Sequence, residues 1–252
     1  MSKVLVIGDS CIDKFIYGTC DRLSPEAPVP VFKPIKSRMS GGMTTNVYNN
    51  LQALGVSCDI ITNDIRPIKT RYIDEISNQM LLRVDEKDSI EQIGLELFKK
   101  IDFKKYDIVV ISDYNKGFLS EIDIEAIVKE SSLVFLDTKK KIGNWAKDVD
   151  FIKINENEFI NNWSTDFELW FKGNLITTLG KDGAILNDGT IYSIMNKHDF
   201  RDVSGAGDTF LAGLVADYIK NNDIRSAIRF ANRCASWVVS QKGVIVIKPE
   251  KL

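Results

Sequence analysis

Residues 108–114 read Ile108-Val109-Val110-Ile111-Ser112-Asp113-Tyr114, an apolar run that ends in a polar cluster. Such a run is typical of a strand buried on both faces, which is the environment of strands in parallel sheets. Similar runs recur at residues 3–7, 58–61, 133–136, 151–154 and 175–179. Because segments with helical periodicity separate several of them, such as 89–100 and 120–130, we predict an α/β fold with helices on both faces of a mostly parallel sheet.

Polar residues follow most of these predicted strands. They are Gly8-Asp9, Ser112-Asp113-Tyr114, Asp137-Thr138-Lys139, the segment 155–158 and the segment 180–183. In open α/β sheets, ligands bind beyond the carboxyl ends of the strands, which meet at one edge of the sheet. We therefore expect these clusters to line one crevice.

Two regions depart from the alternation of strand and helix. Residues 13–36 contain four prolines with apolar residues between them, which favours extended or edge strands over helix. Residues 69–76 and 79–85 show extended patterns on either side of Ser77-Asn78, as two paired strands would. Together these regions predict a small sheet outside the main body.

We predict that this small sheet is a β lid inserted in a single domain of residues 1–252, with lid segments at approximately 14–38 and 66–86. An isolated small sheet is poorly buried and leaves edge strands unpaired. The lid is therefore expected to pair with the lid of a second chain in a homodimer.

The composition limits the classes of partner. The 252 residues include 33 Lys and Arg against 35 Asp and Glu, a net charge of −2, so we expect neither nucleic acid nor membrane as a partner. No apolar run reaches membrane-spanning length, and the first residues do not form a signal-peptide core.

The four cysteines show no paired spacing and His198 is the only histidine, so we expect idle thiols, no zinc cluster and a cytoplasmic location.

Residues 202–210 form a glycine-rich turn, Asp202-Val203-Ser204-Gly205-Ala206-Gly207-Asp208-Thr209-Phe210, before an amphipathic helix. Backbone N–H groups at such a helix start attract anions, and phosphate is the usual ligand. An aspartate beside that anion suggests a base that takes a proton from a group attacking it. The alternative is an ordinary helix start with a favourable first-turn acid.

Three other motif classes fit poorly. Gly180-Lys181 lacks the hydroxyl residue and the upstream glycine of a Walker A loop, and Gly205-Ala206-Gly207 lacks the last glycine of a dinucleotide fingerprint. Gly8-Asp9-Ser10 after the first strand is similar to the nucleophile block of Gly-Asp-Ser hydrolases. However, His198 is the only candidate base, and Met195 stands where the aspartate of such an enzyme is expected.

The motifs taken in order resemble the ribokinase-like pfkB family of carbohydrate kinases. They are Gly8-Asp9 with Asp13, Gly41-Gly42-x-x-x-Asn46, Asn155-x-x-Glu158, Thr178-Leu179-Gly180-x-x-Gly183 and the turn that ends in Asp208. Residues 17–18, 22–31, 78–85 and 112–117 further resemble the branch of this family that phosphorylates D-glycero-β-D-manno-heptose 7-phosphate. The resemblance implies a ribokinase-like three-layer αβα fold with a β lid, and an ATP-dependent sugar kinase that acts on the anomeric hydroxyl.

The resemblance also implies roles for individual residues. Asp208 matches the catalytic base, and Gly205, Ala206 and Gly207 match the turn that holds the transferring phosphoryl group. On the sugar side the matching residues are Asp13, Gly41, Gly42 and Asn46. On the nucleotide side they are Asn155, Thr178, Gly180, Gly183 and Asn232. Asn155 and Glu158 match the element associated with Mg²⁺ and its waters, since oxygen ligands suit that ion.

Several of these assignments keep an alternative. Asn155 and Glu158 are also what a helix cap and its first-turn acid require. Gly41-Gly42 also fits a flexible turn before a helix, and Asn232 fits a hydrogen bond between helices. Three basic residues, Arg71, Arg83 and Lys139, are chemically suited to the distal phosphate of the substrate, although exposed basic residues are common in any strand ribbon.

One departure from the family pattern affects substrate choice. After the strand at 58–61, members usually continue with a Gly-x-Asp-x-x-Gly element, a helix and a strand, whereas here residues 62–67 lead almost directly to Lys69-Thr70-Arg71. The shortening is expected at the sheet edge, away from Asp208. A kinase for another sugar or sugar phosphate, or a non-catalytic binding protein, therefore stays an alternative. Because the sequence ends at Leu252, no fused nucleotidyltransferase domain is expected.

Overall fold

The computed structural model describes residues 2–162, 171–194 and 202–252. Within these residues the centre is an eight-stranded sheet of order β12-β11-β10-β9-β8-β7-β1-β4. Its strands are β1 (Val4–Gly8), β4 (Cys58–Thr62), β7 (Ile108–Asp113), β8 (Val134–Thr138), β9 (Phe151–Asn155), β10 (Asn174–Thr178), β11 (Ala184–Leu186) and β12 (Ile191–Tyr192). The six neighbouring strands β4, β1, β7, β8, β9 and β10 run parallel to one another. Strands β11 and β12 join the sheet in antiparallel pairs. The mostly parallel sheet predicted from the apolar runs is confirmed.

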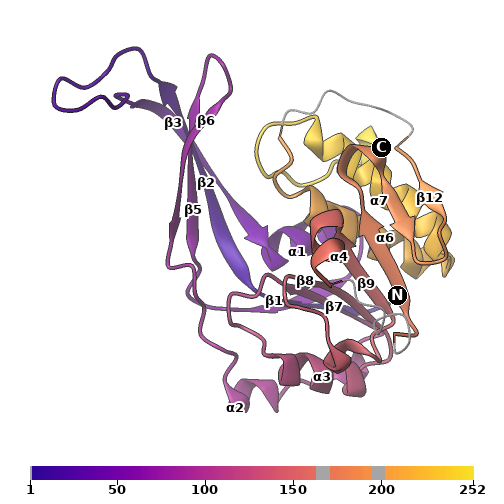
Figure 1. Ribbon diagram of the computed structural model, residues 1–252. Coiled ribbons are helices and arrows are strands. Elements are labelled where there is room, and N and C mark those ends of the chain that lie inside the picture. The colour runs from indigo at the N-terminus through magenta and orange to yellow at the C-terminus, as the bar shows by residue number, and fades with distance from the viewer. Residues whose placement is uncertain (1, 163–170, 195–201) are drawn as a thin grey trace.

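Helices cover both faces of this sheet and complete three layers (Figure 1). They are α1 (Thr44–Ala53), α6 (Ala206–Asn221) and α7 (Ile224–Val239) on one face, and α2 (Leu95–Phe98) and α3 (Glu121–Glu130) on the other, with α4 (Glu156–Asn162) directly after β9. Side chains alternate along a strand. Val4 and Val6 therefore pack in the core with α1, α6 and α7, while Leu5 and Ile7 pack in the core with α3.

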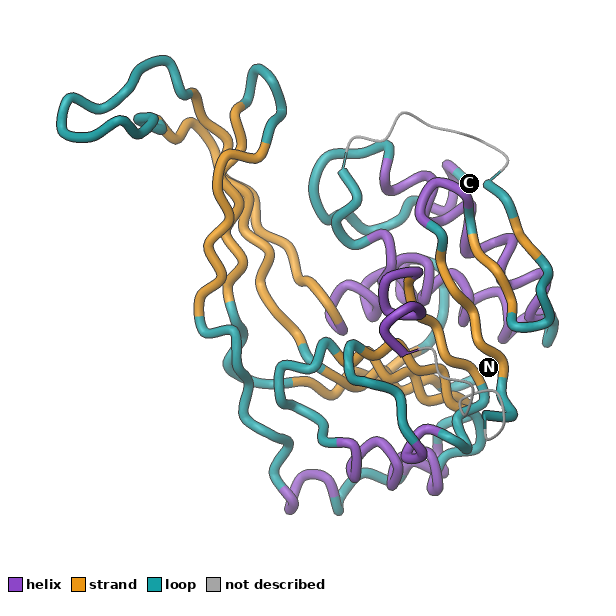
Figure 2. The backbone as a smooth tube through the Cα atoms, in the orientation of Figure 1, coloured by secondary structure: helices purple, strands orange, loops and turns teal. Residues whose placement is uncertain are grey.

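The lid is a second sheet of order β3-β2-β5-β6 that projects from the layered body (Figure 2). Its strands are β2 (Ser10–Thr19), β3 (Lys33–Met43), β5 (Ile68–Asp74) and β6 (Met80–Glu86). Phe15, Tyr17 and Ile73 of the lid form a small buried core with Val244. Two lid strands extend beyond the predicted segment 14–38, because β2 begins directly after β1 and β3 continues to the start of α1, whereas β5 and β6 lie within the predicted segment 66–86.

One prediction about local structure is wrong, and one alternative is not what the structure shows. The helix expected over residues 89–100 is reduced to α2, because the backbone before it bonds to another segment: Ile90 N donates to Lys116 O and Ile93 N to Phe118 O. The flexible turn considered as an alternative at Gly41-Gly42 is instead the end of strand β3, where the two glycines pair with Ile12 and Cys11 of β2. In both places hydrogen bonds to a distant segment override the local pattern.

The shortened region lies where the sequence places it. Strand β4 is at the edge of the central sheet, and residues 63–67 contain neither helix nor strand before β5 begins. The four cysteines are free, and Cys11, Cys58 and Cys234 are buried. Among the described residues, no helix combines the length and the apolar character needed to cross a membrane.

Candidate active site

Asp208 lies in the first turn of α6 and is buried, with 3% of its surface exposed. Its carboxylate accepts two hydrogen bonds, from Asn46 Nδ2 at 3.0 Å and from the Tyr114 hydroxyl at 2.6 Å. Gly205 precedes the helix in a left-handed conformation with φ of 78°, and a Cβ there would lie 2.8 Å from Asn46 Nδ2. The turn therefore needs glycine for its backbone and for the approach of Asn46.

Burial raises the pKa of Asp208 from its ordinary value of 3.8 to about 6. A carboxylate removed from water is harder to ionise, and this effect exceeds the opposing effect of the two hydrogen bonds from Tyr114 and Asn46. A carboxyl group with a pKa near 6 is largely ionised at neutral pH and accepts a proton more readily than an ordinary aspartate. These are the properties of a general base.

Replacing Tyr114 by phenylalanine is expected to raise the pKa of Asp208 above its value of about 6. The Tyr114 hydroxyl stabilises the ionised carboxylate by donating to it, so its loss favours the protonated form. The titration can be followed through the chemical shift of the Asp208 carboxyl carbon. Tyr106→Phe is the matched control, because the Tyr106 hydroxyl donates to Asp59 instead. An unchanged or lower pKa in Tyr114→Phe would show that the hydrogen bond does not set it.

Tyr114 was not among the residues selected from the sequence, although it ends the polar cluster after β7. A buried carboxylate holds its loop: Asp9 accepts hydrogen bonds from the backbone N–H groups of Tyr114 at 2.7 Å, Lys116 at 3.1 Å and Phe118 at 3.1 Å. Burial raises the pKa of Asp9, and these three bonds oppose that rise. Asp9 thus connects the end of β1 to the loop that presents Tyr114 to Asp208.

A pocket of about 350 Å³ opens in front of Asp208, between the body and the lid. Its charged lining comes mostly from the lid strands and from the loops after β7 and β8, and consists of Asp13, Lys69, Arg71, Arg83, Lys116, Lys139 and Asp208. The lining thus carries five cationic groups against two carboxyl groups. Such a pocket suits an anionic ligand that also bears groups for Asp13 and Asp208 to accept from.

Most of these cations have a carboxylate partner. Arg71 binds Asp13 at 2.5 Å, Arg83 binds Asp85 at 2.7 Å, Lys116 binds Asp88 at 2.5 Å and Lys139 binds Glu158. Among the described residues, Lys69 has neither an ion pair nor a hydrogen bond for its ammonium group. That group faces the Tyr114 ring, 5.7 Å from the ring centroid, and only 8% of Lys69 is exposed. Lys69, which the sequence analysis did not select, therefore carries the uncompensated charge of the pocket.

The glycines of β3 leave room for the side chains of Asp13 and Thr45. A Cβ at Gly42 would lie 2.0 Å from Asp13 Oδ2, and one at Gly41 would lie 2.2 Å from Thr45 Cγ2. At these distances a side chain would displace the Asp13 carboxylate or the first turn of α1. The two positions therefore stay without side chains for reasons of space, rather than to form the flexible turn considered above.

Asn155 and Glu158 bind each other across the start of α4. Glu158 Oε2 accepts from Asn155 N at 2.8 Å, Glu158 Oε1 accepts from Asn155 Nδ2 at 2.7 Å, and Asn155 Oδ1 accepts from Glu158 N at 2.9 Å. This is the helix-cap alternative. Lys139 also donates to Glu158 Oε1, so three of about four acceptor positions of this carboxylate are used. One position on Oε2 remains, which suits a water of Mg²⁺ but not direct coordination by both residues.

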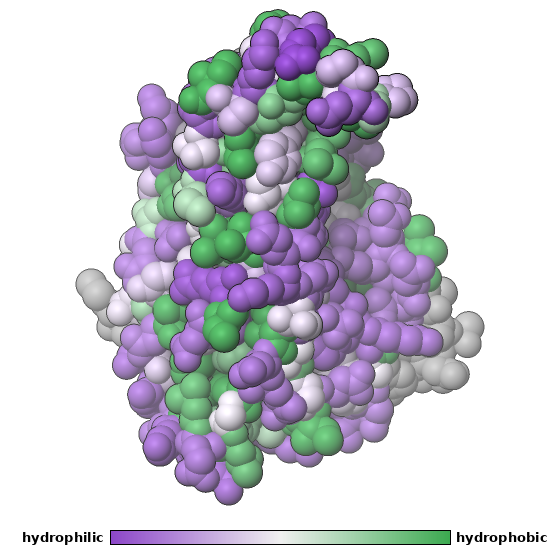
Figure 3. Space-filling model, turned by 90° about the vertical axis from the view of Figure 1, so that its left-hand side faces the viewer, coloured by the Kyte–Doolittle hydropathy of each residue, from purple (hydrophilic) through white to green (hydrophobic). Residues whose placement is uncertain are grey.

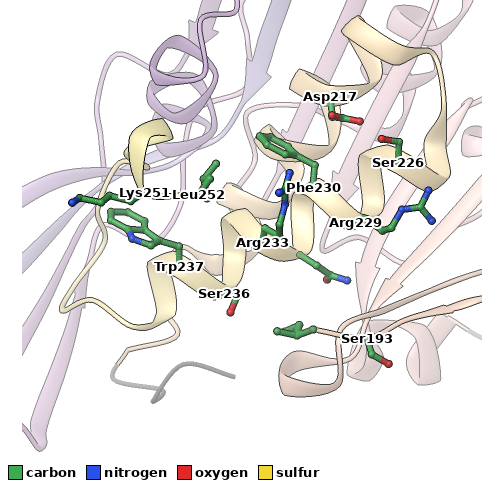
Figure 4. Close-up of a pocket in the computed structure, with 12 residues that line it drawn as sticks. Ser193, Asp217, Ser226, Arg229, Phe230, Arg233, Ser236, Trp237, Lys251 and Leu252 are labelled. Atoms are coloured by element: carbon green, nitrogen blue, oxygen red, sulfur yellow. The ribbon is translucent and has the colours of Figure 1, made fainter. Parts of the chain in front are cut away.

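The other residues that the sequence assigns to the nucleotide lie along or just after β10 and on α7. Thr178 ends β10. Gly180 begins the short helical turn that follows, and Gly183 comes directly after that turn. Asn232 Nδ2 donates to the Tyr192 carbonyl of β12 at 2.7 Å, so it joins a helix to a strand and not to a helix. Asn232 also lines a second pocket of about 470 Å³, together with Arg229, Arg233 and Trp237 of α7 and with Ser193 (Figure 4).

The structure brings part of the selected residues together at one pocket, whereas of the remaining ones only Asn232 lines the second pocket. Asp13, Arg71, Arg83, Lys139, Gly205 and Asp208 line the first pocket, with Gly42 and Asn46 directly behind them. Ser10, the alternative nucleophile, is fully buried and its hydroxyl accepts from the hydroxyl of Thr45. Its required base, His198, and Met195 lie outside the described residues. Ser10 therefore has a structural partner and no access to a substrate.

Comparison of the sequence with known families supports one of these interpretations. A family model described as pfkB family carbohydrate kinase matches residues 91–251. The bifunctional protein HldE of a Nitratiruptor species is 32% identical, and the match covers 99% of this chain and 64% of that protein. The D-beta-D-heptose 7-phosphate kinase of Bordetella bronchiseptica is 29% identical, with 100% of this chain and 95% of that protein covered.

These matches differ in extent. The chain spans between 61% and 66% of the length of the first HldE relatives. The alignment with the Nitratiruptor protein extends over 297 positions, whereas this chain has 252 residues. The aligned part of the relative therefore contains residues that this chain lacks.

Solved structures share the fold at low sequence identity. A ribokinase from Thermotoga maritima has a TM-score of 0.75 at 17% identity, covering 99% of this chain and 98% of that one. An Arabidopsis thaliana ribokinase complexed with ribose and ATP has a TM-score of 0.71 at 14% identity, covering 98% and 97%. The predicted three-layer fold with a β lid is therefore confirmed.

Proposed function

The chain belongs to the pfkB family of carbohydrate kinases, and from that premise we propose that it transfers the γ-phosphoryl group of ATP to a hydroxyl group of a phosphorylated sugar. One observation carries the proposal. Asp208, a buried carboxyl group with a raised pKa of about 6, lies at the glycine turn of α6 and faces a pocket rich in cations. A base, an anion-binding helix start and a basic acceptor pocket are what phosphoryl transfer to a sugar phosphate needs.

In the proposed reaction, Asp208 takes the proton of the acceptor hydroxyl as its oxygen bonds to the γ-phosphorus. The bond from that phosphorus to ADP breaks, and ADP leaves with the electron pair. The N–H groups of Gly205 and Gly207 bind the phosphoryl oxygens at the start of α6, and Ala206, whose N–H donates to the Val203 carbonyl at 3.2 Å, holds the turn between them. Asn46 and Tyr114 hold the Asp208 carboxylate in one orientation, which reduces the entropy lost on reaching the reactive geometry.

The proposed acceptor is D-glycero-β-D-manno-heptose 7-phosphate, phosphorylated at its anomeric hydroxyl to the 1,7-bisphosphate. The names of the relatives support this choice, and the excess of cations in the pocket supports a phosphorylated acceptor. Asp13 and Asn46 would bind sugar hydroxyls, with the backbone of Gly41 and Gly42 close to the ring. Another sugar phosphate with the same charge is the alternative within this class.

ATP is proposed to approach from the side of Thr178, Gly180, Gly183 and Asn232, of which Asn232 lines the pocket along α7. Mg²⁺ would arrive with the nucleotide, and when bound it would neutralise phosphate charge. Asn155 and Glu158 would hold it through its waters, as the remaining acceptor position of Glu158 allows.

The lid is proposed to belong to the same domain, residues 1–252, and to pair with a second copy of the chain. Exposed apolar side chains support the pairing, among them Ile35, Met39, Met80 and Leu82. In the view onto the lid, hydrophobic residues lie among hydrophilic ones (Figure 3). Covering them in a homodimer would remove apolar surface from water.

The test is ADP formation from ATP in the presence of a panel of sugar phosphates and of the same sugars without phosphate. We expect turnover with a heptose 7-phosphate and much less with the unphosphorylated sugars, because those sugars have no phosphate group for the cations of the pocket to bind. ATP binding without turnover on any acceptor would contradict the kinase proposal and favour a non-catalytic binding protein. The retained base Asp208 argues against that alternative.

A further inference from the structure

We propose that Lys153 is a further catalytic residue, whose ammonium group binds the phosphoryl group during its transfer. The inference rests on the kinase function proposed above. No motif drew attention to this residue, because it lies inside the apolar run of β9, two positions before Asn155. Its role follows from its surroundings in the fold.

Lys153 is buried, with 3% of its surface exposed, and its ammonium group lies next to the first turn of α6. A Cβ built on Gly207 would be 3.1 Å from Lys153 Nζ. The ammonium group therefore occupies the space that a side chain at Gly207 would need. Gly207 belongs to the turn whose N–H groups are expected to bind phosphate, so Lys153 and these N–H groups converge on the same place.

This convergence is electrostatically unfavourable unless an anion binds there. The N-terminus of a helix carries a partial positive charge, and a buried ammonium group beside it adds a full one. Asp137 compensates in part, since its Oδ2 accepts from Lys153 Nζ at 2.6 Å. An ammonium group has three N–H donors, and among the described residues Lys153 uses one of them. Two donors remain for a ligand at the turn.

The partner of Lys153 is itself incompletely bonded. Asp137 Oδ1 is buried and has no hydrogen-bond partner among the described residues, and Lys139 Nζ lies 3.8 Å from it. A buried ion pair that served only to join β8 to β9 would be expected to have its bonds satisfied. The open bonds on both members instead fit a pair that holds a cation ready for a charged ligand.

The positive charge of Lys153 also affects the pKa of Asp208. Burial is the main reason for the raised pKa of Asp208; Asp137 raises it further and Lys153 lowers it. Lys153 therefore helps to keep Asp208 ionised while it binds the phosphoryl group. In the reaction the acceptor proton goes to Asp208 and the leaving electron pair to ADP, and Lys153 keeps its protons throughout, donating hydrogen bonds to phosphoryl oxygens.

The first test compares nucleotide affinities by calorimetry, without any acceptor sugar. Wild-type protein is expected to bind a non-hydrolysable ATP analogue more tightly than ADP, because only ATP places a phosphoryl group at Lys153. Lys153→Met is expected to lose this preference while binding ADP as before, and Lys153→Arg to keep part of it. An unchanged preference for the ATP analogue in Lys153→Met would overturn the inference.

The second test separates catalysis from folding. Lys153→Met is expected to lower kcat by a factor of about 10²–10³, the effect of removing one preorganised transition-state contact, with little change in the KM of the acceptor. Since Lys153→Met leaves Asp137 buried without its hydrogen-bonded partner, Lys153→Met/Asp137→Asn is measured beside it. The double variant is expected to recover thermal stability but not kcat. Recovery of both would show that Lys153 is only structural.

The outcomes also distinguish this inference from the proposed function. If wild-type protein turns over no acceptor but prefers the ATP analogue through Lys153, the proposed reaction fails and the phosphate contact stands. If wild-type protein is an active kinase and Lys153→Met is equally active, the reaction stands and the inference fails.

Discussion

Replacing Asp208 by asparagine is expected to lower kcat by a factor of about 10²–10⁴, the range that a positioned general base contributes. An asparagine amide can keep both contacts of the native carboxylate, since its oxygen can accept from Asn46 Nδ2 and its NH₂ can donate to the Tyr114 hydroxyl oxygen. The substitution therefore removes basicity with little change in shape. Steady-state ADP formation with a heptose 7-phosphate as acceptor measures the loss.

The stability of the same variant serves as its folding control. The folded protein raises the pKa of Asp208 from 3.8 to about 6, so it holds this proton more tightly than the unfolded chain does. As the pH rises past both pKa values, the free energy of unfolding falls by on the order of 3 kcal/mol relative to acid conditions. Asparagine has no charge to bury. Asp208→Asn is therefore expected to melt at the same temperature as wild type, or higher, at pH values above about 6.

Asp148→Asn is the matched control for Asp208→Asn, because Asp148 is exposed and lies outside the pocket. It is expected to leave kcat unchanged. A well-folded Asp208→Asn with wild-type kcat would remove Asp208 from its role as base. Loss of activity together with loss of the folded state would call for Asp208→Ser as a second variant, which also lacks a base and is smaller.

Replacing Lys69 by methionine is expected to weaken the preference for phosphorylated acceptors. Lys69 is the cation of the pocket without a carboxylate partner among the described residues, so its ammonium group is available to the distal phosphate. A hydrogen bond between charged groups contributes about 1.5–3 kcal/mol. We therefore expect kcat/KM for a heptose 7-phosphate to fall by a factor of about 10–100, while kcat/KM for the unphosphorylated sugar stays the same.

The ratio of the two kcat/KM values is the measurement, because it cancels any general effect on the lid. Lys14→Met is the matched control: Lys14 follows Asp13 on β2, so its side chain points to the opposite face of the lid. Lys14→Met should leave the ratio unchanged. If Lys69→Met lowers both values equally, Lys69 supports the lid and does not bind the phosphate.

The parts of the fold that depend on local pattern could be predicted from the sequence. Apolar runs such as residues 108–111 are buried strands, and the turn before Asp208 starts a helix. Both could be predicted because apolar periodicity and helix-start residues are properties of neighbouring positions in the sequence. The helix expected at 89–100 could not be corrected in this way. Its backbone bonds to residues 116 and 118, and no pattern within the segment reports that contact.

The same distinction applies to the site. Asp208 and Gly205 belong to a contiguous motif and were found. Tyr114, Lys69 and Lys153 were missed, because the role proposed for each depends on residues far along the chain that the fold brings close to it. Lys153 in particular looks like an interruption in an apolar strand until Gly207 is seen beside it. Such residues become visible only when distances between elements are known.

The most direct test of the kinase proposal is phosphorus NMR of wild-type protein incubated with ATP and a heptose 7-phosphate. We predict that the γ-phosphate signal of ATP decreases while ADP and a new anomeric phosphate monoester appear in equal amounts, with the 7-phosphate retained. Formation of ADP with inorganic phosphate and no sugar bisphosphate, or no loss of ATP, would contradict the account.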